Sequence, residues 1–245
     1  MKPIYRCAQQ VEQVQRAWAV VYQCYRRQGL ISRNALGIHA VPHAIGSHAC
    51  VIYEEQRHTV LSTMTVMADR IGGLPLDNAY PEALDRLRQQ GTAMVEVGLF
   101  ADRRQSIKRT AKALFAMMRW VAYYTLHHGR SDIVIGIHPH HAGFYKRCFG
   151  FELFGKEKKY SLVNDNPVVP LRLPLRDAMT ASKLPRGLDY IRNNPLPAKA
   201  FSQRFRFDQP ALQGSLIERL LGRQTHEPAT TGIDFGAMQS VPQPV

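Results

Sequence analysis

The sequence predicts an α/β domain built on one mixed β-sheet. An apolar strand over Ala93–Phe100, a helix over Ser106–His127 and a strand over Asp132–Ile137 follow one another, and such a unit makes a parallel pair of strands. Two alternating segments, Ala49–Tyr53 and Thr59–Met67, flank a charged turn and predict an antiparallel hairpin ahead of that pair. The sequence contains no dinucleotide-binding or P-loop glycine pattern, so we do not expect a Rossmann repeat.

The other elements each have a local signal. Apolar residues at helical spacing predict a helix over residues 9–28, which Gly29 ends. Pro81 suits the first position of a short helix that ends at Gly91. The C-terminal half of the domain is expected to contain a short helix after residue 138, a turn at Gly150, and strand-like segments over residues 159–163 and 168–173.

Length and composition suggest one domain with an extension. The 245 residues are 45% hydrophobic and 21% charged, which is enough to bury a substantial core. We expect residues 1–175 to form the main domain. Residues 176–221 would be a partly helical extension, with one short helix over Leu212–Leu221. Residues 222–245, rich in Thr, Gly, Gln and Pro, would be a disordered tail.

The formal net charge of +13 is the largest deviation from average composition. It points to a polyanionic partner, which could be nucleic acid, an anionic membrane, a phosphorylated cofactor or an acidic carrier protein. The bases gather at one helix start, and no helix-turn-helix or RNA-binding signature is present, so nucleic acid is not the partner that we expect.

The cysteines and the N-terminus indicate a cytoplasmic protein. The four cysteines are widely spaced, without a CxxC pair, and we expect free thiols in a reducing compartment. The N-terminal segment lacks the apolar core of a signal peptide, and no apolar run is long enough to span a membrane.

Glu96 is the strongest candidate for a catalytic residue. It lies in the middle of an apolar strand, where alternation places it on one face with Met94 and Gly98, and places Val97 and Leu99 on the other. An apolar wall would raise its pKa and make it a general base near neutral pH. The alternative is an ordinary solvent-facing or salt-bridged glutamate.

The start of the following helix is strongly basic. Between Asp102 and Asp132 the chain has no acid, and the first helical turns are expected to contain Arg103, Arg104, Lys108, Arg109 and Lys112. Cations oppose the helix dipole there, and a bound anion would explain their presence. A solvated basic face is the alternative.

The segment that follows the second parallel strand contains a tyrosine and several histidines as further candidates. The phenol of Tyr145 could donate a proton to a leaving group, although packing alone would also explain it. His138, His140 and His141 invite a metal interpretation, but no acid or cysteine stands at ligand spacing, and we expect no metal.

Taken in order, these elements resemble the GNAT acyltransferase superfamily over roughly residues 5–175. The segments that carry the resemblance are YQCYRRQGLI with GIHA, GGLPLDNAYPEALDRLR, VEVGLFA and IHPHHAGFYKRCFGFE. They are similar to those of the long-chain N-acyl amino acid synthases, which are relatives of the acyl-homoserine lactone synthases. The resemblance implies a GNAT-like fold with a mixed central sheet, splayed parallel strands and flanking helices.

The resemblance also implies an activity, the transfer of a fatty acyl group from acyl carrier protein to the α-amine of a small amino acid. Glu96 would be the base and Tyr145 would face the leaving thiol. The acyl-phosphopantetheine donor and its carrier would bind at Leu99, Phe100, Ala101, Arg103, Arg104, Lys108 and Arg109. The acyl chain would lie against Trp18, Met64, Met94 and Phe100. No bound cofactor is implied, and the amphiphilic product would bring the enzyme near a membrane.

One departure from the superfamily pattern bears on the donor. Coenzyme A users carry a glycine-rich loop before this helix, whereas this chain has no glycine between Gly98 and Gly129. Side-chain cations suit a single phosphate on an acidic protein better than a wrapped pyrophosphate. The alternatives are a coenzyme A-dependent acyltransferase, an acyl-homoserine lactone synthase, a nucleic-acid-binding protein and a non-catalytic binder of acyl carrier protein.

Overall fold

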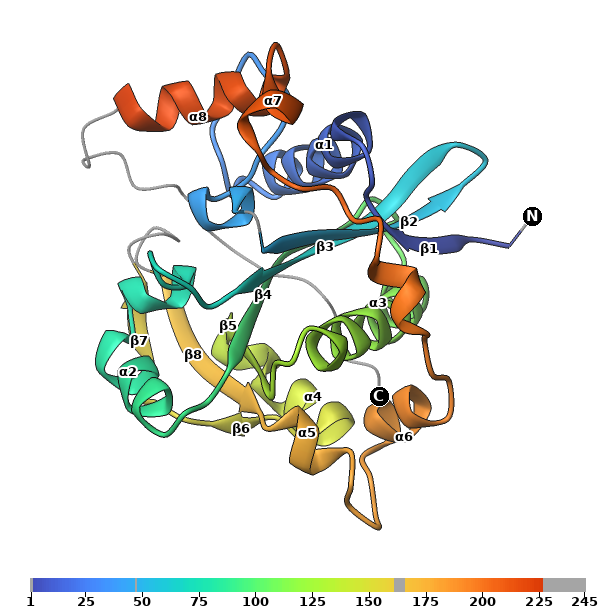
Figure 1. The fold of residues 1–245 in the computed structure, drawn as a ribbon, viewed down its shortest axis with the longest axis vertical. Coiled ribbons are helices and arrows are strands. Elements are labelled where there is room, and N and C mark those ends of the chain that lie inside the picture. The colour runs from blue at the N-terminus through green and yellow to red at the C-terminus, as the bar shows by residue number, and fades with distance from the viewer. Residues whose placement is uncertain (1, 47, 161–165, 227–245) are drawn as a thin grey trace.

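The computed structural model describes residues 2–46, 48–160 and 166–226 and confirms the mixed sheet (Figure 1). The strand order is β1 (Ile4–Cys7), β2 (Ala49–Gln56), β3 (Thr59–Ala68), β4 (Met94–Asp102), β5 (Asp132–Ile137), β8 (Asn166–Leu173) and β6 (Glu152–Leu153), with β7 (Lys158–Tyr160) paired to β8. β4 and β5 are parallel, as predicted, and the other described pairs are antiparallel.

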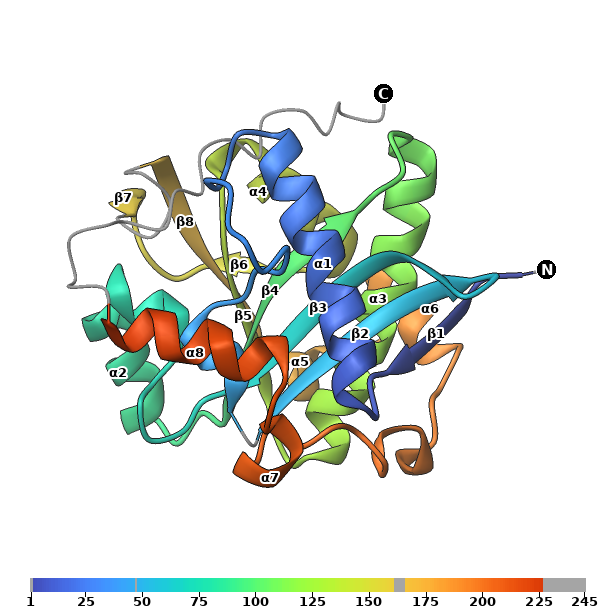
Figure 2. The same cartoon turned by 90° about the horizontal axis from the view of Figure 1, so that it is seen from above.

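Helices cover both faces of the sheet (Figures 1 and 2). One face packs on α3 (Ile107–His127), α4 (Pro139–Phe149), the short α5 (Leu175–Ala178), α6 (Arg186–Arg192) and the 3-10 turn η4 (Ala198–Phe201). The other face packs on α1 (Val11–Arg27), the 3-10 turn η1 (Pro42–Ile45), α7 (Gln209–Leu212) and α8 (Leu216–His226). A third cluster lies under the 3-10 turn η2 (Pro75–Asn78) and α2 (Pro81–Gln89).

The predicted hairpin is present, with longer strands than the sequence pattern indicated. β2 continues through Glu54 and Glu55, which were expected in the turn. The chain reverses at Arg57 and His58, whose φ angles of 51° and 61° suit a tight two-residue hairpin turn. Charged residues looked like a turn because sequence alone does not show the ion pairs that let Glu54 be buried.

β4 contains a β-bulge that the alternation pattern did not reveal. Thr63 faces Ala101 and Thr65 faces Gly98, so Leu99 and Phe100 together oppose a single residue, Met64. Leu99 adopts φ 52°, in the left-handed region. The predicted alternation therefore holds as far as Gly98 and fails at Leu99, whose side chain turns into the α1-side core away from Val97.

The two parallel strands separate soon after they meet, as expected. Their register runs from Met94 opposite Asp132 to Glu96 opposite Val134, and no pairing continues beyond that point in the described residues. β5 pairs with β8 on its other side throughout Ile133–Ile137. A gap between the backbones of β4 and β5 therefore opens directly after Glu96.

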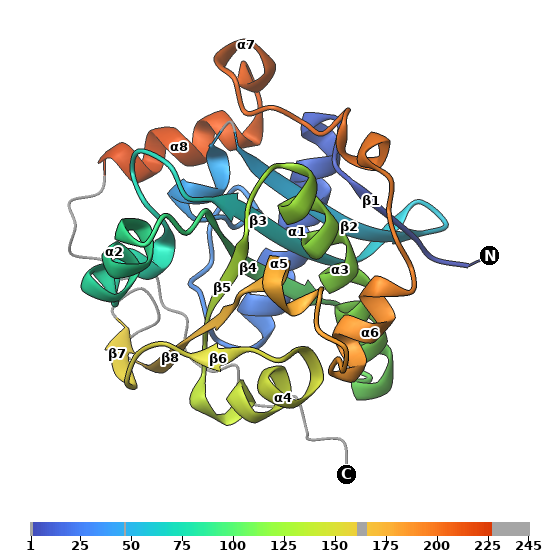
Figure 3. The same ribbon diagram turned by 60° about the horizontal axis from the view of Figure 1, so that its bottom comes forward.

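The C-terminal extension wraps around the sheet edge at β1 (Figure 3). Phe201 is buried in the α3-side core, and Phe207 and Ile217 are buried in the α1-side core. Between them the Phe205 N–H donates to the Ala8 carbonyl at 2.6 Å. Two helices, α7 and α8, replace the single helix expected over Leu212–Leu221, and α8 continues to His226. Residues 227–245 of the expected tail lie outside the described residues.

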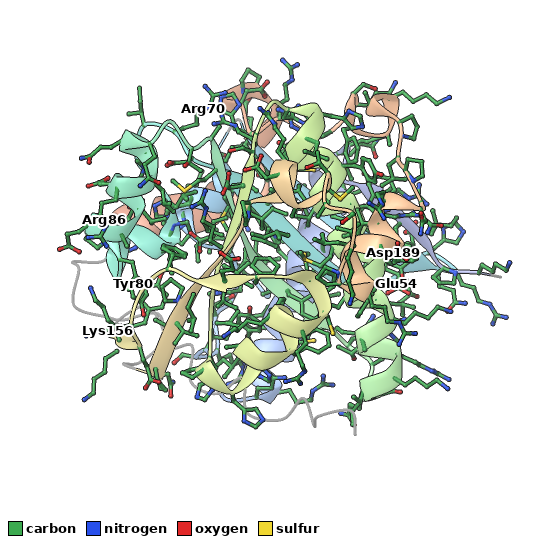
Figure 4. All side chains as sticks on the ribbon, turned by 90° about the horizontal axis from the view of Figure 1, so that it is seen from below. Glu54, Arg70, Tyr80, Arg86, Lys156 and Asp189 are labelled. Atoms are coloured by element: carbon green, nitrogen blue, oxygen red, sulfur yellow. The ribbon has the colours of Figure 1, made fainter. Side chains whose placement is uncertain are left out.

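The excess positive charge is spread over the periphery rather than confined to one helix. Arg70, Arg86 and Lys156 are exposed at the rim of the molecule (Figure 4). The four cysteines are free thiols, three of them buried. Among the helices of the described residues, none is both long and apolar enough to cross a membrane.

Candidate active site

A cavity opens where β4 and β5 separate. β4 contributes Glu96, Val97, Gly98 and Leu99, and β5 and the residue after it contribute Gly136, Ile137 and His138. The remaining wall consists of Tyr25, Leu30, Val41, Met67, Pro75, Tyr160, Asn166, Pro167 and Val168. Its volume is about 150 Å³. Since one water needs roughly 10–15 Å³ on this measure, a group of several heavy atoms fits.

Glu96 is the acidic side chain of this cavity. It is 6% exposed, and its Oε2 accepts a hydrogen bond of 2.8 Å from the Leu76 N–H. Burial raises the pKa of Glu96 to about 8; the Leu76 N–H opposes this rise, and Asp77 and Asp69 add to it. Within the described residues no cation forms an ion pair with it. Its carboxyl group is therefore set to exchange a proton near neutral pH.

Tyr145 lies beside the cavity rather than in its lining. It is half-buried on α4, with its ring 5.7 Å from that of Phe151, and burial raises the pKa of Tyr145 to about 12. Tyr145 adds electrostatically to the raised pKa of the Tyr25 phenol, which lines the cavity. Tyr145 therefore stays protonated at neutral pH, close to the α1 end of the site.

The histidines at the start of α4 have separate positions. His138 caps the helix by accepting from the His140 N–H, and it lines the cavity. Burial, followed by the charges of His141 and His140, lowers the pKa of His138, so it is neutral at pH 7. Across the described part of the chain, no three His, Cys, Asp or Glu side chains gather in a way that could hold a metal ion.

The basic segment before α3 divides into two parts. α3 begins at Ile107, so Arg103 and Arg104 precede the helix instead of lying in its first turn. Ser106 makes no side-chain cap, which leaves first-turn N–H groups available to an anion. Lys108 and Arg109 are exposed there, without a side-chain hydrogen bond or ion pair among the described residues. The exposed Arg103 donates to the Val60 carbonyl and to Gln23.

Arg104, which the sequence suggested as a donor-binding residue, is paired with two acidic side chains of the sheet. Its guanidinium donates to Glu54 Oε1 at 2.8 Å and Oε2 at 2.5 Å, and to Asp102 Oδ2 at 2.8 Å. The Glu54 side chain is fully buried, and that of Asp102 is 2% exposed. Because both carboxylates occupy the guanidinium, Arg104 is part of a structural ion pair.

The predicted acyl-chain residues do not come together. Trp18 stacks on Phe207 in the α1-side core, Met64 lies in the α3-side core, and Met94 lies in the cluster under α2. Phe100 packs against the α3-side core. None of the four lines the cavity, and they are divided among three separate hydrophobic clusters. Of the predicted donor residues on β4, Leu99 lines it and Ala101 is buried in the α1-side core.

Sequence reasoning missed Tyr25, His138 and Tyr160 as cavity residues. In the sequence, Tyr25 falls on the apolar face of the first predicted helix, and Tyr160 falls in an ordinary predicted strand. A signal was present for His138, because it directly follows the carboxyl end of a parallel strand, where ligand sites of open α/β sheets occur. The hydrogen bond from Leu76 had no side-chain signal, since its donor is backbone.

We expect Gly136→Ala to destabilise the protein by about 1–3 kcal/mol and to lower kcat. A Cβ at Gly136 would stand 2.6 Å from Leu76 Cδ1 and 3.3 Å from Val168 Cγ2, so it would displace the residue whose N–H holds Glu96. Urea unfolding and steady-state kinetics measure both effects. Gly46→Ala is the matched control, because its Cβ would meet only the His43 carbonyl, at 3.7 Å.

The fold is that of the GNAT-like acyltransferases. The structure of FeeM, an N-acyl amino acid synthase from uncultured soil microbes, matches with a TM-score of 0.63 and 22% identity, covering 73% of this chain and 95% of that one. The acyl-homoserine lactone synthase LasI matches with a TM-score of 0.55 and 16% identity, over 71% of this chain and 90% of that one. MesI, a CoA-dependent acyl-homoserine lactone synthase, matches with a TM-score of 0.53 and 11% identity, over 78% and 94%.

The sequence profile of the family of N-acyl amino acid synthase FeeM matches residues 16–174, more than half of the chain. No curated protein sequence matches significantly. The chain belongs to the FeeM family of N-acyl amino acid synthases and is an amide-forming acyltransferase. The fold expected from the sequence, and the kinship with acyl-homoserine lactone synthases, are confirmed.

Proposed function

We propose that this acyltransferase moves a long-chain fatty acyl group from acyl carrier protein to the α-amine of an amino acid. The observation that carries the proposal is the position of Glu96, a buried carboxyl group in the cavity between the splayed strands. Burial raises the pKa of Glu96 to about 8, which brings it closer to that of an amino-acid ammonium than an ordinary carboxylate is, so the proton transfer is less unfavourable.

The reaction begins when Glu96 accepts one proton from the acceptor ammonium, directly or through a water. The free amine attacks the thioester carbonyl and forms the new C–N bond, and negative charge collects on the carbonyl oxygen. The bulge at Leu99 and Phe100 interrupts the β3–β4 ladder beside the cavity, and we place the oxyanion there, where a backbone N–H outside the ladder would stabilise it.

Collapse of the intermediate breaks the C–S bond. Tyr145, held protonated by its raised pKa, donates a hydrogen bond to the departing sulfur. The phenol is a weaker acid than the thiol, so the thiolate takes its proton from the nitrogen that becomes the amide. Glu96 then releases its proton to solvent. The products are the N-acyl amino acid, the free phosphopantetheine thiol and that proton, and no bound cofactor takes part.

Two features favour acyl carrier protein as the donor. The segment from Gly98 to Gly129 has no glycine to wrap a pyrophosphate, and the uncapped start of α3 can bind one phosphate. Lys108 and Arg109 are exposed at the same place and suit an acidic protein surface. The likeness to a CoA-dependent synthase makes acyl-CoA the donor to test against it.

The acceptor is a small amino acid, and the site is expected to work in the cytoplasm. The cavity wall is mainly apolar; besides Glu96, its polar side chains are Tyr25, Tyr160, Asn166 and the neutral His138. The product, an acyl chain with a carboxylate head, partitions into membranes and would bring the enzyme close to their surface. The protein needs no nucleic-acid partner for this reaction.

The decisive experiment offers the purified protein one acyl chain on acyl carrier protein, on coenzyme A and on pantetheine, with a mixture of amino acids. Mass spectrometry identifies the amide products. We expect N-acyl amino acids, formed fastest from the carrier protein. Formation from acyl-CoA alone would contradict the donor, and an acyl-homoserine lactone as the product would contradict the acceptor.

Reversing the charges of Lys108 and Arg109 to Glu is expected to raise the KM for acyl carrier protein about tenfold at low salt. Each exposed charge contributes up to about 1 kcal/mol, and both would now repel an acidic carrier. Initial rates at increasing salt measure the effect, which should shrink as salt screens the charges.

Two controls separate docking from catalysis in this double variant. The rate with acyl-pantetheine should not change, because that donor has no protein surface. Arg86→Glu with Lys156→Glu removes the same charge from exposed positions at the α2 side of the molecule, away from α3, and should leave the KM near the wild-type value (Figures 2 and 4). Equal increases in both double variants would refute a specific docking face.

A further inference from the structure

The segment between β3 and α2 holds the Glu96 carboxyl group through a single backbone bond. This segment, residues 69–80, includes η2, and the Leu76 N–H at its centre donates to Glu96 Oε2 at 2.8 Å. Residues 72–80 of this segment, GGLPLDNAY, form part of the resemblance noted above, but the acyl-transfer chemistry does not use their side chains. Its position nevertheless decides where the carboxyl group points.

Arg88 on α2 ties together both ends of this segment. Its Nε and one terminal nitrogen donate to Asp69 at 2.8 and 2.9 Å, and its terminal nitrogens donate to Asp77 at 2.7 and 2.8 Å. A further bond of 2.7 Å reaches Asp85 on the same helix. The hydrogen bonds that Arg88 donates to Asp77 and to Asp69, in that order, raise the pKa of Arg88, so it is a permanent cation.

The packing around the segment leaves it little freedom. Asp77 Oδ2 also accepts from the Leu74 N–H at 2.7 Å, and a Cβ on Gly73 would stand 2.5 Å from that oxygen. Tyr160 donates to the Pro75 carbonyl at 2.6 Å. Leu76 is fully buried against Gly136. A displacement of Asp77 is therefore passed directly to the turn that carries the Leu76 N–H.

The charges that face Glu96 come from several elements. Asp77 on η2 and Asp69 at the end of β3 both disfavour its ionisation. Tyr160 on β7, Tyr25 on α1 and His138 after β5 line the same cavity and are neutral at pH 7. Arg88 is the cation bound to both aspartates, so it offsets the charge that they direct at Glu96.

We propose that Arg88 is a positioning residue that sets the orientation and the proton affinity of Glu96 through the segment 69–80. The inference rests on the proposed role of Glu96 as the base. Removing the Arg88 charge leaves Asp69 and Asp77 uncompensated, which makes Glu96 harder to ionise. Removing the Asp69 charge has the opposite electrostatic effect, since Arg88 remains.

The test compares pH profiles of kcat/KM for Arg88→Met, Arg88→Lys and Asp69→Asn. For Arg88→Met we expect the rising limb to move to higher pH, with about a tenfold loss at pH 7 and less than about threefold at pH 9.5. For Asp69→Asn the limb moves to lower pH. Arg88→Lys keeps the charge, and its limb should return toward that of the wild type.

A second readout does not depend on activity. Carbon NMR of protein with labelled Glu side chains follows the ionisation of Glu96, whose signal is assigned by its absence in Glu96→Gln. The titration should move in the same opposite directions in Arg88→Met and Asp69→Asn. Titrations of Glu96 that do not move, or that move in the same direction in the two variants, would overturn the role of Arg88. If Arg88→Met does not fold, an unmoved titration of Glu96 in Asp69→Asn alone would overturn it.

The outcomes also separate this inference from the proposed function. If Glu96→Gln retains its activity, the base assignment fails whatever the Arg88 variants do. If Glu96→Gln is inactive and the titration of Glu96 does not respond to Arg88 or Asp69, the base assignment stands and the positioning role alone is wrong.

Discussion

Replacing Glu96 by Gln is expected to lower kcat/KM by about two to four decades without loss of the folded state. The Gln side chain has nearly the same shape, and its carbonyl can still accept the hydrogen bond from the Leu76 N–H. What disappears is the ability to take a proton from the acceptor ammonium. Initial rates with acyl carrier protein as the donor, and circular dichroism of the same sample, measure both parts.

The pH dependence sharpens this expectation. The base must be ionised to act, and a pKa of about 8 leaves about a tenth of Glu96 ionised at pH 7. The wild-type kcat/KM should therefore rise with pH and level off above that value. The residual rate of Glu96→Gln should lack this limb, and the exposed Glu152→Gln should keep it. A wild-type profile in folded Glu96→Gln would falsify the assignment of the base.

The same ionisation predicts a change in stability. Folding raises the pKa of Glu96 from 4.5 to about 8, so the folded protein binds more protons than the unfolded chain between these values. The wild-type free energy of unfolding should therefore fall as the pH rises through this window. Glu96→Gln lacks that slope and should melt at a higher temperature than the wild type at pH 8 to 9, as expected where a residue serves function at the expense of stability.

Local sequence signals were sufficient for most of the framework. Pro81 opens α2, and Gly91 and Gly150, both with positive φ, follow the helices that they end. The strand–helix–strand order was enough to predict that β4 and β5 are parallel. The alternation of side chains along a strand was enough to predict the sheet face on which Glu96 lies. Each of these signals depends on neighbours in the chain, so no tertiary information was needed to interpret them.

The missing parts of the site depend on contacts between distant residues. The bulge at Leu99 arises from the register with β3, and the bond from Leu76 joins segments twenty residues apart. The pairing of Arg104 with Glu54 spans fifty residues, and a basic run gives no sign of which member is already bound. The four predicted acyl-chain residues lie apart for a related reason, because hydrophobicity marks burial but not the cluster in which a residue is buried.

Arg104→Met should reduce the free energy of unfolding by about 3–5 kcal/mol, because it leaves Glu54 buried without its cation. For a chain of this size the melting temperature should fall by roughly 10 °C. The Glu54 carboxylate would keep the neutral Ser62 hydroxyl, at 2.6 Å, and the Tyr5 hydroxyl as hydrogen-bond donors, but it would lose its cation. Chemical denaturation followed by circular dichroism measures the loss.

Two variants identify the buried charge as the cause. The exposed Arg103→Met should change the unfolding free energy by no more than about 0.5 kcal/mol, although it removes the same charge from the neighbouring position. Adding Glu54→Leu to Arg104→Met should recover much of the loss, because an apolar side chain needs no partner there. If Arg104→Met were as stable as Arg103→Met but bound acyl carrier protein more weakly, Arg104 would have to be assigned to donor binding instead of to a structural ion pair. A raised KM accompanied by the expected instability would instead reflect a loosened β2–β4 framework, and only rates normalised to the folded fraction distinguish these two cases.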